Sequence, residues 1–372
     1  MIRLPILLVL LFTAATLTAR PQARATNVIL FLADAAGIPT LNAASIHGHG
    51  ENRRLFVQRM PHIGLSDTAT ASQIVTDSAA GMTAIVTGQR THNGVIGMGP
   101  DAVRGSKDGT SLTTILEMAE ARGLSTGVIS NDALTGATPA ALYAKVNDRN
   151  KTADIFRQMF LSRAGDGPDV MIGSGRAAVV DALKAEKTTI EAIAAQHKRP
   201  VLGSLDAVSD RDTRAIVLLE DRNFDLAAAV RTARRMLSAN PRGYFLMVEA
   251  DAHTDALRPG LERLLVLDRV IGETAAVAGP DTLILFTADH SFDLRVHSGT
   301  WGKPLLTGAA AESGGGMESV HLANVRMDDA HTAEEVLVAA QGPGAERVRG
   351  YMANTDLFHV MLKALGWSES GN

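Results

Sequence analysis

The sequence predicts an α/β fold with a central, mostly parallel sheet that has helices on both faces. Continuous apolar runs of strand length recur along the chain, and segments with helical spacing separate them. Runs that are apolar at every position are typical of parallel strands buried on both faces. The runs are NVILFLAD (27–34), STGVISND (125–132), DVMIG (169–173), YFLMVEAD (244–251) and TLILFTADH (282–290).

Helices are expected between these strands. Thr110 or Ser111 could cap a helix over SLTTILEMAEAR, which Gly123 would end. A long helix is expected over residues 259–278, before the helix-ending pair Gly-Pro. Residues 151–240 are less clearly patterned, and we expect them to belong to the same domain.

The first 25 residues have the features of a signal peptide. Arg3 precedes an apolar run from residue 4 to about 17, and Ala23-Arg24-Ala25 is a small-x-small cleavage pattern. The run is shorter than the roughly 20 residues that a membrane-spanning helix needs. We therefore expect one domain over residues 26–372, periplasmic or secreted and not held in a membrane. An uncleaved N-terminal anchor is the alternative.

Composition narrows the class of partner and of metal ligand. The net charge is -4, and long blocks of one sign are lacking, which argues against nucleic acid or an anionic membrane and favours small molecules. The chain has no cysteine, so neither disulfides nor thiolate chemistry is available. Any metal ion must be held by His, Asp, Glu, Ser or Thr, which suits zinc or magnesium.

Acidic residues fall where the apolar runs end. Carboxyl ends of parallel strands share one edge of a sheet, and open α/β sheets bind their ligands there. Acids gathered on that edge would repel one another unless a cation neutralised them. The acids are Asp34, Asp132, Glu249, Asp251 and Asp289.

Histidines accompany these acids. TADHS places Asp289 beside His290 at a strand end, and FLMVEADAHTD is the densest cluster of metal-binding residue types in the chain. His331 precedes the strand-like EEVLVAA. A carboxylate with an imidazole is a donor set that suits zinc, although a lone histidine such as His331 is more often structural.

Ser78, in VTDSAAGMTA, has two compatible interpretations. It could cap a helix over the small residues that follow it. It could also be a nucleophile, since a helix N-terminus offers free amides and a positive dipole to an attacked phosphate. The segment has no GxSxG pattern, which disfavours a Ser-His-Asp hydrolase.

Taken together, these motifs resemble those of the alkaline phosphatase family, in the family's order over residues 27–345. They are LFLADAAG, VTDSAAGMTA, ATPAALYAKVNDR, FLMVEAD, FTADH and HTAEEVLVAAQGP. The resemblance implies the fold of that family, two zinc ions, one magnesium ion and a phosphoserine intermediate on Ser78. It leaves both a monomer and a homodimer open.

The resemblance also implies a role for each matching residue. Arg149, eleven residues after Thr138, would hold two phosphate oxygens with its planar guanidinium. The metal ligands implied are Asp34, Ser78, Asp289 and His290 for one zinc ion, His331 for the other, and Asp34, Thr138 and Glu249 for magnesium.

Two segments depart from the family pattern. The family usually continues its glutamate strand as EGxxIDxxxH, whereas this chain has the compressed EADAHTDALRP. His253 and Asp251 are the favoured donors for the second zinc ion, with Asp255 as the alternative. Gly136 stands where relatives often carry Asp or His near the magnesium ion.

The expected function is hydrolysis of small-molecule phosphate monoesters. A phosphodiesterase, phosphonate hydrolase or sulfatase of the same superfamily is one alternative. A catalytically inactive protein that binds metal and phosphate is the other, because the second zinc segment is irregular.

Overall fold

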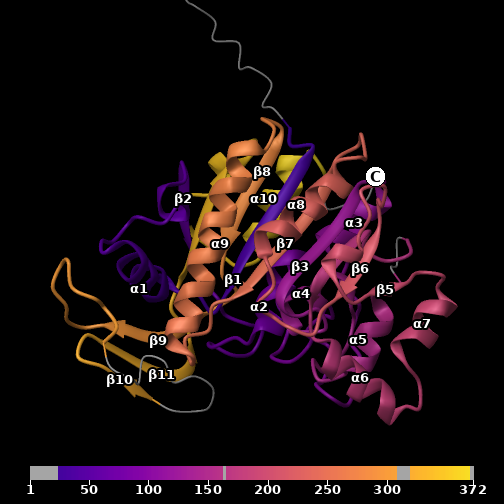
Figure 1. Ribbon diagram of the computed structural model, residues 1–372, viewed down its shortest axis with the longest axis horizontal. Coiled ribbons are helices and arrows are strands. Elements are labelled where there is room, and N and C mark those ends of the chain that lie inside the picture. Colours follow the sequence, from indigo (N-terminus) through magenta and orange to yellow (C-terminus); the bar gives the residue numbers. More distant parts are fainter. Residues whose placement is uncertain (1–23, 162–164, 308–318, 369–372) are drawn as a thin grey trace, which may run out of the picture.

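The computed structural model describes residues 24–161, 165–307 and 319–368, and its main feature is a ten-stranded sheet (Figure 1). The strand order is β13-β2-β12-β8-β1-β7-β3-β4-β6-β5. All neighbours are parallel except β12, which runs antiparallel to β2 and β8. The expected signal peptide, residues 1–25, lies outside the described residues apart from Arg24 and Ala25.

The strands of the large sheet draw on almost the whole described chain. Those at its centre are buried along nearly their full length, as expected for strands covered on both faces. Their bounds are β1 Asn27–Asp34, β2 His62–Ser66, β3 Ser125–Ala133, β4 Val170–Ser174, β5 Val201–Leu202, β6 Ala215–Leu218, β7 Tyr244–Asp251, β8 Thr282–Thr287, β12 Val336–Gln341 and β13 Gly350–Met352.

Helices form a layer on each face of this sheet, and each layer closes its own apolar core. The layer over the near face in Figure 1 contains α1 Ile38–His49, α8 Leu226–Leu237 and α9 Leu257–Val277. The other layer contains α2 Ser78–Thr87, α3 Ile115–Ala121, α4 Ala137–Tyr143, α5 Thr152–Gln158, α6 Arg176–Ala185, α7 Ile190–Gln196 and α10 Asp356–Leu365. No helix among the described residues is long and apolar enough to cross a membrane.

A second, three-stranded sheet projects from the carboxyl edge of the first, at the lower left of Figure 1. It consists of β9 Ser291–Val296, β10 Val320–His321 and β11 Val325–Thr332, all antiparallel. β9 begins directly after His290, and β11 pairs His331 with Phe292. The small sheet therefore brings two histidines from distant parts of the chain to one place.

The predicted α/β class and the five predicted strands are confirmed, with ends that shift by no more than three residues. Two predicted helix caps are wrong. Thr114, rather than Thr110 or Ser111, caps α3, because its hydroxyl accepts from the N–H of Glu117 and the Glu117 carboxylate accepts from the N–H of Thr114. Asp77, rather than Ser78, caps α2, and Ser78 is its first residue.

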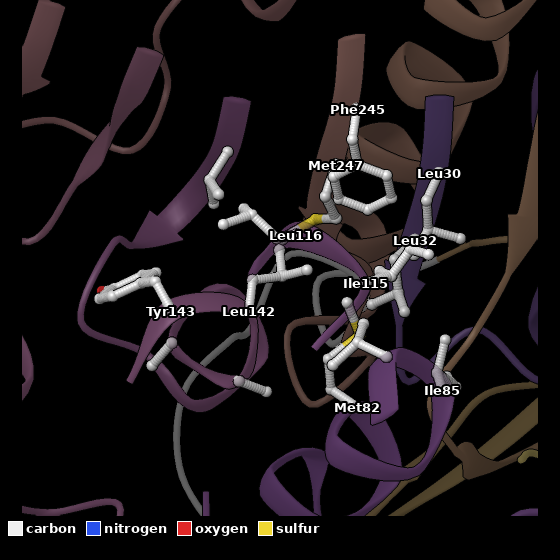
Figure 2. Close-up of a cluster of buried hydrophobic side chains, with 14 of the residues drawn as sticks. Leu30, Leu32, Met82, Ile85, Ile115, Leu116, Leu142, Tyr143, Phe245 and Met247 are labelled. Carbon is white, nitrogen blue, oxygen red and sulfur yellow. The ribbon is translucent and has the colours of Figure 1, made fainter. Parts of the chain in front are cut away.

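Helix α2 is held against the sheet by large apolar side chains. Figure 2 shows Met82 and Ile85 of α2 in one cluster with Leu30 and Leu32 of β1 and Met247 of β7. The helix is buried along its entire length, so its position relative to the strand ends is fixed by packing on all sides. Its first residue therefore faces the carboxyl edge of the sheet.

Replacement of Ile85, which is 1% exposed, by alanine should lower the free energy of unfolding by about 2–5 kcal/mol, because a cavity would remain under β1. Ile74→Ala is the matched control, because Ile74 is 77% exposed and its truncation removes little buried area. Urea unfolding of both variants measures the difference. Equal losses would mean that α2 is not anchored by this cluster.

Candidate active site

The sequence-predicted acids do meet at the carboxyl edge of the sheet. Asp34 is the last residue of β1 and lies opposite Asp251, the last residue of the neighbouring β7. Glu249 of β7 lies opposite Ser130 of β3, and its carboxylate accepts a hydrogen bond from the Ser130 hydroxyl. Asp289 follows β8, on the other side of β1. Adjacent strands thus place these carboxylates side by side.

Ser78 joins this edge from α2. Its Oγ lies 3.4 Å from Oδ2 of Asp34 and 3.3 Å from Nε2 of His290, and its side chain is buried. Asp77 caps the helix by accepting from the N–H of Ala80, so Ser78 stands in the first turn. The hydroxyl is therefore at the positive end of a helix and beside potential metal ligands.

The spacing of these donors fits a cation better than a set of direct hydrogen bonds. Nε2 of His290 lies 3.2 Å from Oδ1 of Asp34 and 3.7 Å from Oδ2 of Asp289, which accepts no hydrogen bond from any described residue. Ligands about 2.0–2.1 Å from a tetrahedral zinc ion lie about 3.3 Å from one another. Asp34, Asp289 and His290 are therefore close enough to share one cation, with the Ser78 hydroxyl beside two of them.

A second candidate position is formed by three imidazoles. His253, His290 and His331 come from the loop after β7, the end of β8 and β11, and one nitrogen of each lies within 4.8 Å of the others. The rings of His290 and His331 stack with centroids 3.8 Å apart. His253 is the residue from the compressed segment that reaches this group.

Hydrogen bonds fix the tautomer and the orientation of two of these rings. Nδ1 of His290 lies 3.1 Å from the carbonyl oxygen of Ser291, and Nδ1 of His331 lies 3.0 Å from that of Thr76. A carbonyl only accepts, so each Nδ1 carries a proton and Nε2 is the nitrogen that could bind a metal ion.

The residues expected to hold magnesium lie on the other side of Asp34. Oγ1 of Thr138, at the start of α4, donates to Oδ2 of Asp34 over 3.3 Å. Glu249 is fully enclosed, and burial together with the charge of Asp34 on the neighbouring strand raises its pKa. Hydroxyl and carboxylate oxygens of this kind suit a hard cation such as magnesium.

Arg149 lies at the mouth of the site and is oriented by Asp77. Its guanidinium donates to Oδ2 of Asp77 over 3.1 Å, and its backbone N–H donates to the carbonyl of Gly94. The same Asp77 oxygen accepts from the N–H of Gly94. The Asp77 carboxylate thus caps the helix that begins with Ser78 and also positions the guanidinium of Arg149.

Two of the predicted ligands are placed differently from the rest. The Oδ1 atom of Asp251 accepts from His253, and its Oδ2 atom accepts from Arg222 and Arg263. Asp255 is not grouped with the imidazoles, and its carboxylate accepts from the N–H of Ala256, the next residue. The compressed segment therefore contributes one imidazole, that of His253, to the site. The neighbouring carboxylates of Asp251 and Asp255 accept hydrogen bonds from other groups.

The comparisons with known proteins agree with this geometry. The sequence matches the family described as alkaline phosphatase over residues 25–179 and 185–304. The chain belongs to the alkaline phosphatase family. Family members are hydrolases and depend on metal ions, and the two groups of possible metal ligands described above lie at the edge of the sheet where Ser78 stands.

Relatives cover nearly the whole chain. Alkaline phosphatase of Escherichia coli K12 is 28% identical and matches 95% of this chain and 89% of its own length. Streptomycin-6-phosphate phosphatase of Streptomyces griseus is 29% identical, with 97% and 95% covered. The solved alkaline phosphatase of the Antarctic bacterium TAB5 superimposes with a TM-score of 0.75 at 23% identity over 94% of this chain and all of its own, which confirms the fold.

Electrostatic interactions within the site are strong. Burial and the neighbouring Asp34 raise the pKa of Asp289 to about 6. Burial, followed by Asp34 and Asp132, raises the pKa of Glu249 well above its ordinary value. The pKa of Asp34 is lowered despite its burial, because His253 and His290 favour its anion. Acids forced this close titrate as a group, and divalent cations would relieve their repulsion.

The sequence analysis missed the structural role of Gly81. A Cβ atom at this position would lie 2.8 Å from the carbonyl oxygen of Asp289 and 3.3 Å from its Cβ. The absence of a side chain lets the second turn of α2 approach the loop that carries Asp289 and His290. The run of small residues after Ser78 was the available signal. Arg222 and Arg263 were also missed, and no local pattern marks them, because they meet Asp251 only through the fold.

Zinc affinity should depend on pH through His253. Burial alone would lower the pKa of this imidazole, but Asp34 and Asp251 raise it to about 10, so the metal-free protein holds a proton there at neutral pH. Burial and His290 lower the pKa of His331 to about 4, so His331 is already neutral. Zinc binding must displace the His253 proton, so the apparent affinity should rise with pH between about pH 6 and 9.

Competition with a chelator of known protonation behaviour measures this slope. His253→Gln is the control, because its side-chain amide has no proton that zinc must displace. An affinity in the unmodified protein that does not change with pH would contradict the assignment of His253.

Proposed function

We propose that the protein is a metal-dependent phosphomonoesterase that forms a phosphoserine intermediate on Ser78. The observation that carries the proposal is the position of the Ser78 hydroxyl at the N-terminus of α2, 3.3 Å from Nε2 of His290 and 3.4 Å from Oδ2 of Asp34. A serine hydroxyl is a weak nucleophile at neutral pH and needs activation. Its neighbours are suited to hold the cation that would activate it.

The donor sets support two zinc ions and one magnesium ion. Three groups would hold them: Asp34, Ser78, Asp289 and His290 for the first zinc ion; His253 and His331, with His290 nearby, for the second; and Asp34, Thr138 and Glu249 for magnesium. The bound ions would favour the alkoxide of Ser78 and neutralise charge on the phosphoryl oxygens.

The chain's own residues account for binding and orientation. Oγ of Ser78 forms a bond to phosphorus while the bond to the alcohol oxygen breaks, and water later releases phosphate from the serine. Free amides in the first turn of α2 and the guanidinium of Arg149 would bind the phosphoryl oxygens. Asp77 fixes the position of Arg149 relative to the first turn of α2, because it caps this helix and accepts a hydrogen bond from Arg149.

The substrate class follows from which part of the substrate the site grips. A phosphate monoester would present a dianion to Arg149 and the metal ions, and each role proposed above concerns the phosphoryl group rather than the alcohol. The names of the relatives, which include a streptomycin-6-phosphate phosphatase, are consistent with monoesters of varied alcohols. We propose small-molecule phosphate monoesters as substrates and do not assign one alcohol.

We further propose that residues 26–372 form one domain that acts in the periplasm or outside the cell. The large sheet supports this, because it takes strands from Asn27 to Met352. The apolar N-terminal run and the small-x-small pattern support export.

Ser78→Ala should lower turnover of p-nitrophenyl phosphate by at least about 10³-fold, because it removes the nucleophile. Phosphate incorporation into the protein should vanish at the same time. Ser106→Ala, at an exposed loop position, is the control and should leave both readouts unchanged. Full activity in Ser78→Ala would rule out the phosphoserine route.

Arg149→Ala should weaken inhibition by inorganic phosphate about 10- to 100-fold, because charge-assisted hydrogen bonds contribute about 1.5–3 kcal/mol. The rate of the chemical step should fall less than phosphate binding does. Arg269→Ala, which removes an exposed arginine on α9, is the control. An unchanged inhibition constant in Arg149→Ala would remove this residue from the phosphate site.

A further inference from the structure

We propose that Asp251 is a positioning residue, which orients His253 toward the second metal position and is not itself a ligand there. The inference rests on the proposed function, because it takes the metal positions from it. In the compressed segment His253 follows Asp251 by only two residues. We assign the imidazole of His253 as a metal ligand and the carboxylate of Asp251 as the group that orients it.

The three imidazoles share one arrangement. Nδ1 of His290 and Nδ1 of His331 each donate to a backbone carbonyl, and Nδ1 of His253 lies 2.8 Å from Oδ1 of Asp251. Metal-binding histidines usually donate their other ring N–H to a carbonyl or carboxylate, which fixes the tautomer and raises the basicity of the ligating nitrogen. The Asp251 carboxylate accepts from Nδ1 of His253, just as the carbonyls of Ser291 and Thr76 accept from Nδ1 of His290 and of His331.

Both carboxylate oxygens of Asp251 are occupied by this role. Besides Nδ1, the backbone N–H of His253 donates to Oδ1 over 2.9 Å. Arg222 and Arg263 both donate to Oδ2, and Arg263 also donates to the Asp251 carbonyl. Coordination of a metal ion by Asp251 would require the loss of several charge-assisted hydrogen bonds, each stronger than an ordinary one.

Asp251 already has positively charged partners without a metal ion. Arg222 also pairs with Asp132 over 3.5 Å, so two carboxylates face the two guanidinium groups of Arg222 and Arg263. The situation of Asp289 is different, because its Oδ2 is buried and accepts no hydrogen bond from any described residue. Asp289 therefore offers an oxygen that a cation could bind, whereas at Asp251 the arginines already supply the positive charge.

Helix α9 holds the same segment from below. A Cβ atom on Gly260 would lie 2.1 Å from the carbonyl oxygen of His253 and 3.2 Å from that of Ala252. Arg263 stands one turn further along the helix. The short loop between β7 and α9 therefore packs against the backbone of the helix at Gly260. Arg263 of the same helix donates a hydrogen bond to the loop. These two contacts restrict the orientation of His253.

Substitution of Asp251 distinguishes the two roles. Asp251→Asn keeps an oxygen that can accept from Nδ1, so the full-length protein should still bind zinc at the second position, with affinity reduced about 10- to 100-fold. Asp251→Ala should be weaker than Asp251→Asn, and His253→Ala should lose the ion at this position. Zinc content and chelator competition measure all three.

Cobalt substitution provides a readout of the ligands themselves. The visible absorption of the Co²⁺-loaded protein reports its donor set, so Asp251→Asn should keep the band positions of the unmodified protein while His253→Ala shifts them. Asp251→Asn that behaves like His253→Ala in both zinc content and spectrum would make Asp251 a direct ligand and overturn the inference.

A pair of glycine variants in α9 tests whether this helix positions the loop that carries His253, and neither variant changes a metal ligand. Gly260→Ala should displace the loop and weaken zinc binding at the second position. Gly272→Ala is the matched control on the same helix, because its Cβ would meet only the Phe56 ring at 3.4 Å. Equal zinc affinity in both variants would contradict a role for α9 in placing His253.

Failure of the inference can be told apart from failure of the proposed function. If the unmodified protein binds no zinc and hydrolyses no monoester, the proposed function fails and takes the inference with it. If it binds zinc and is active, but Asp251→Asn loses the second ion entirely, the inference alone fails.

Discussion

The repulsion among buried carboxylates at one edge of the sheet is the constraint on which the rest of this structure depends. Parallel pairing of β1 with β7 and β8 forces Asp34 into the company of Glu249 and Asp289, away from water. Burying like charges costs free energy unless cations or protons compensate. The fold tolerates that cost at a single edge, and every element that carries chemistry converges there.

Packing on the two faces of the sheet turns this edge into a defined geometry. The apolar cluster around Met82 and Ile85 fixes α2, which sets the height of Ser78 above the strand ends. The small sheet of β9 and β11 holds His290 and His331 in stacked contact from the opposite side. Ser78 and the imidazoles are thus held by separate structural units, because α2 packs on the large sheet whereas His290 and His331 adjoin the small one.

Much of this arrangement was predictable from the sequence, because continuous apolar runs and the acids that end them are local features. The strands, the parallel sheet and the meeting of Asp34 with Asp289 follow from that pattern and from the common direction of parallel strands. The cap of α2 was misassigned because Asp77 and Ser78 are both good capping residues, and only backbone geometry decides which lies outside the helix. The surroundings of Asp251 could not be predicted, because Arg222 and Arg263 reach it from two different elements.

Gly81 illustrates how little freedom the chain has at its centre. With only a hydrogen atom in place of a side chain, α2 and the Asp289 loop lie in contact backbone to backbone. Nineteen of the twenty amino acids would act there as a spacer and separate the serine from its partners. Variation at this position would therefore change the distance between Ser78 and the Asp289 loop, and any library of variants of this chain should keep glycine there.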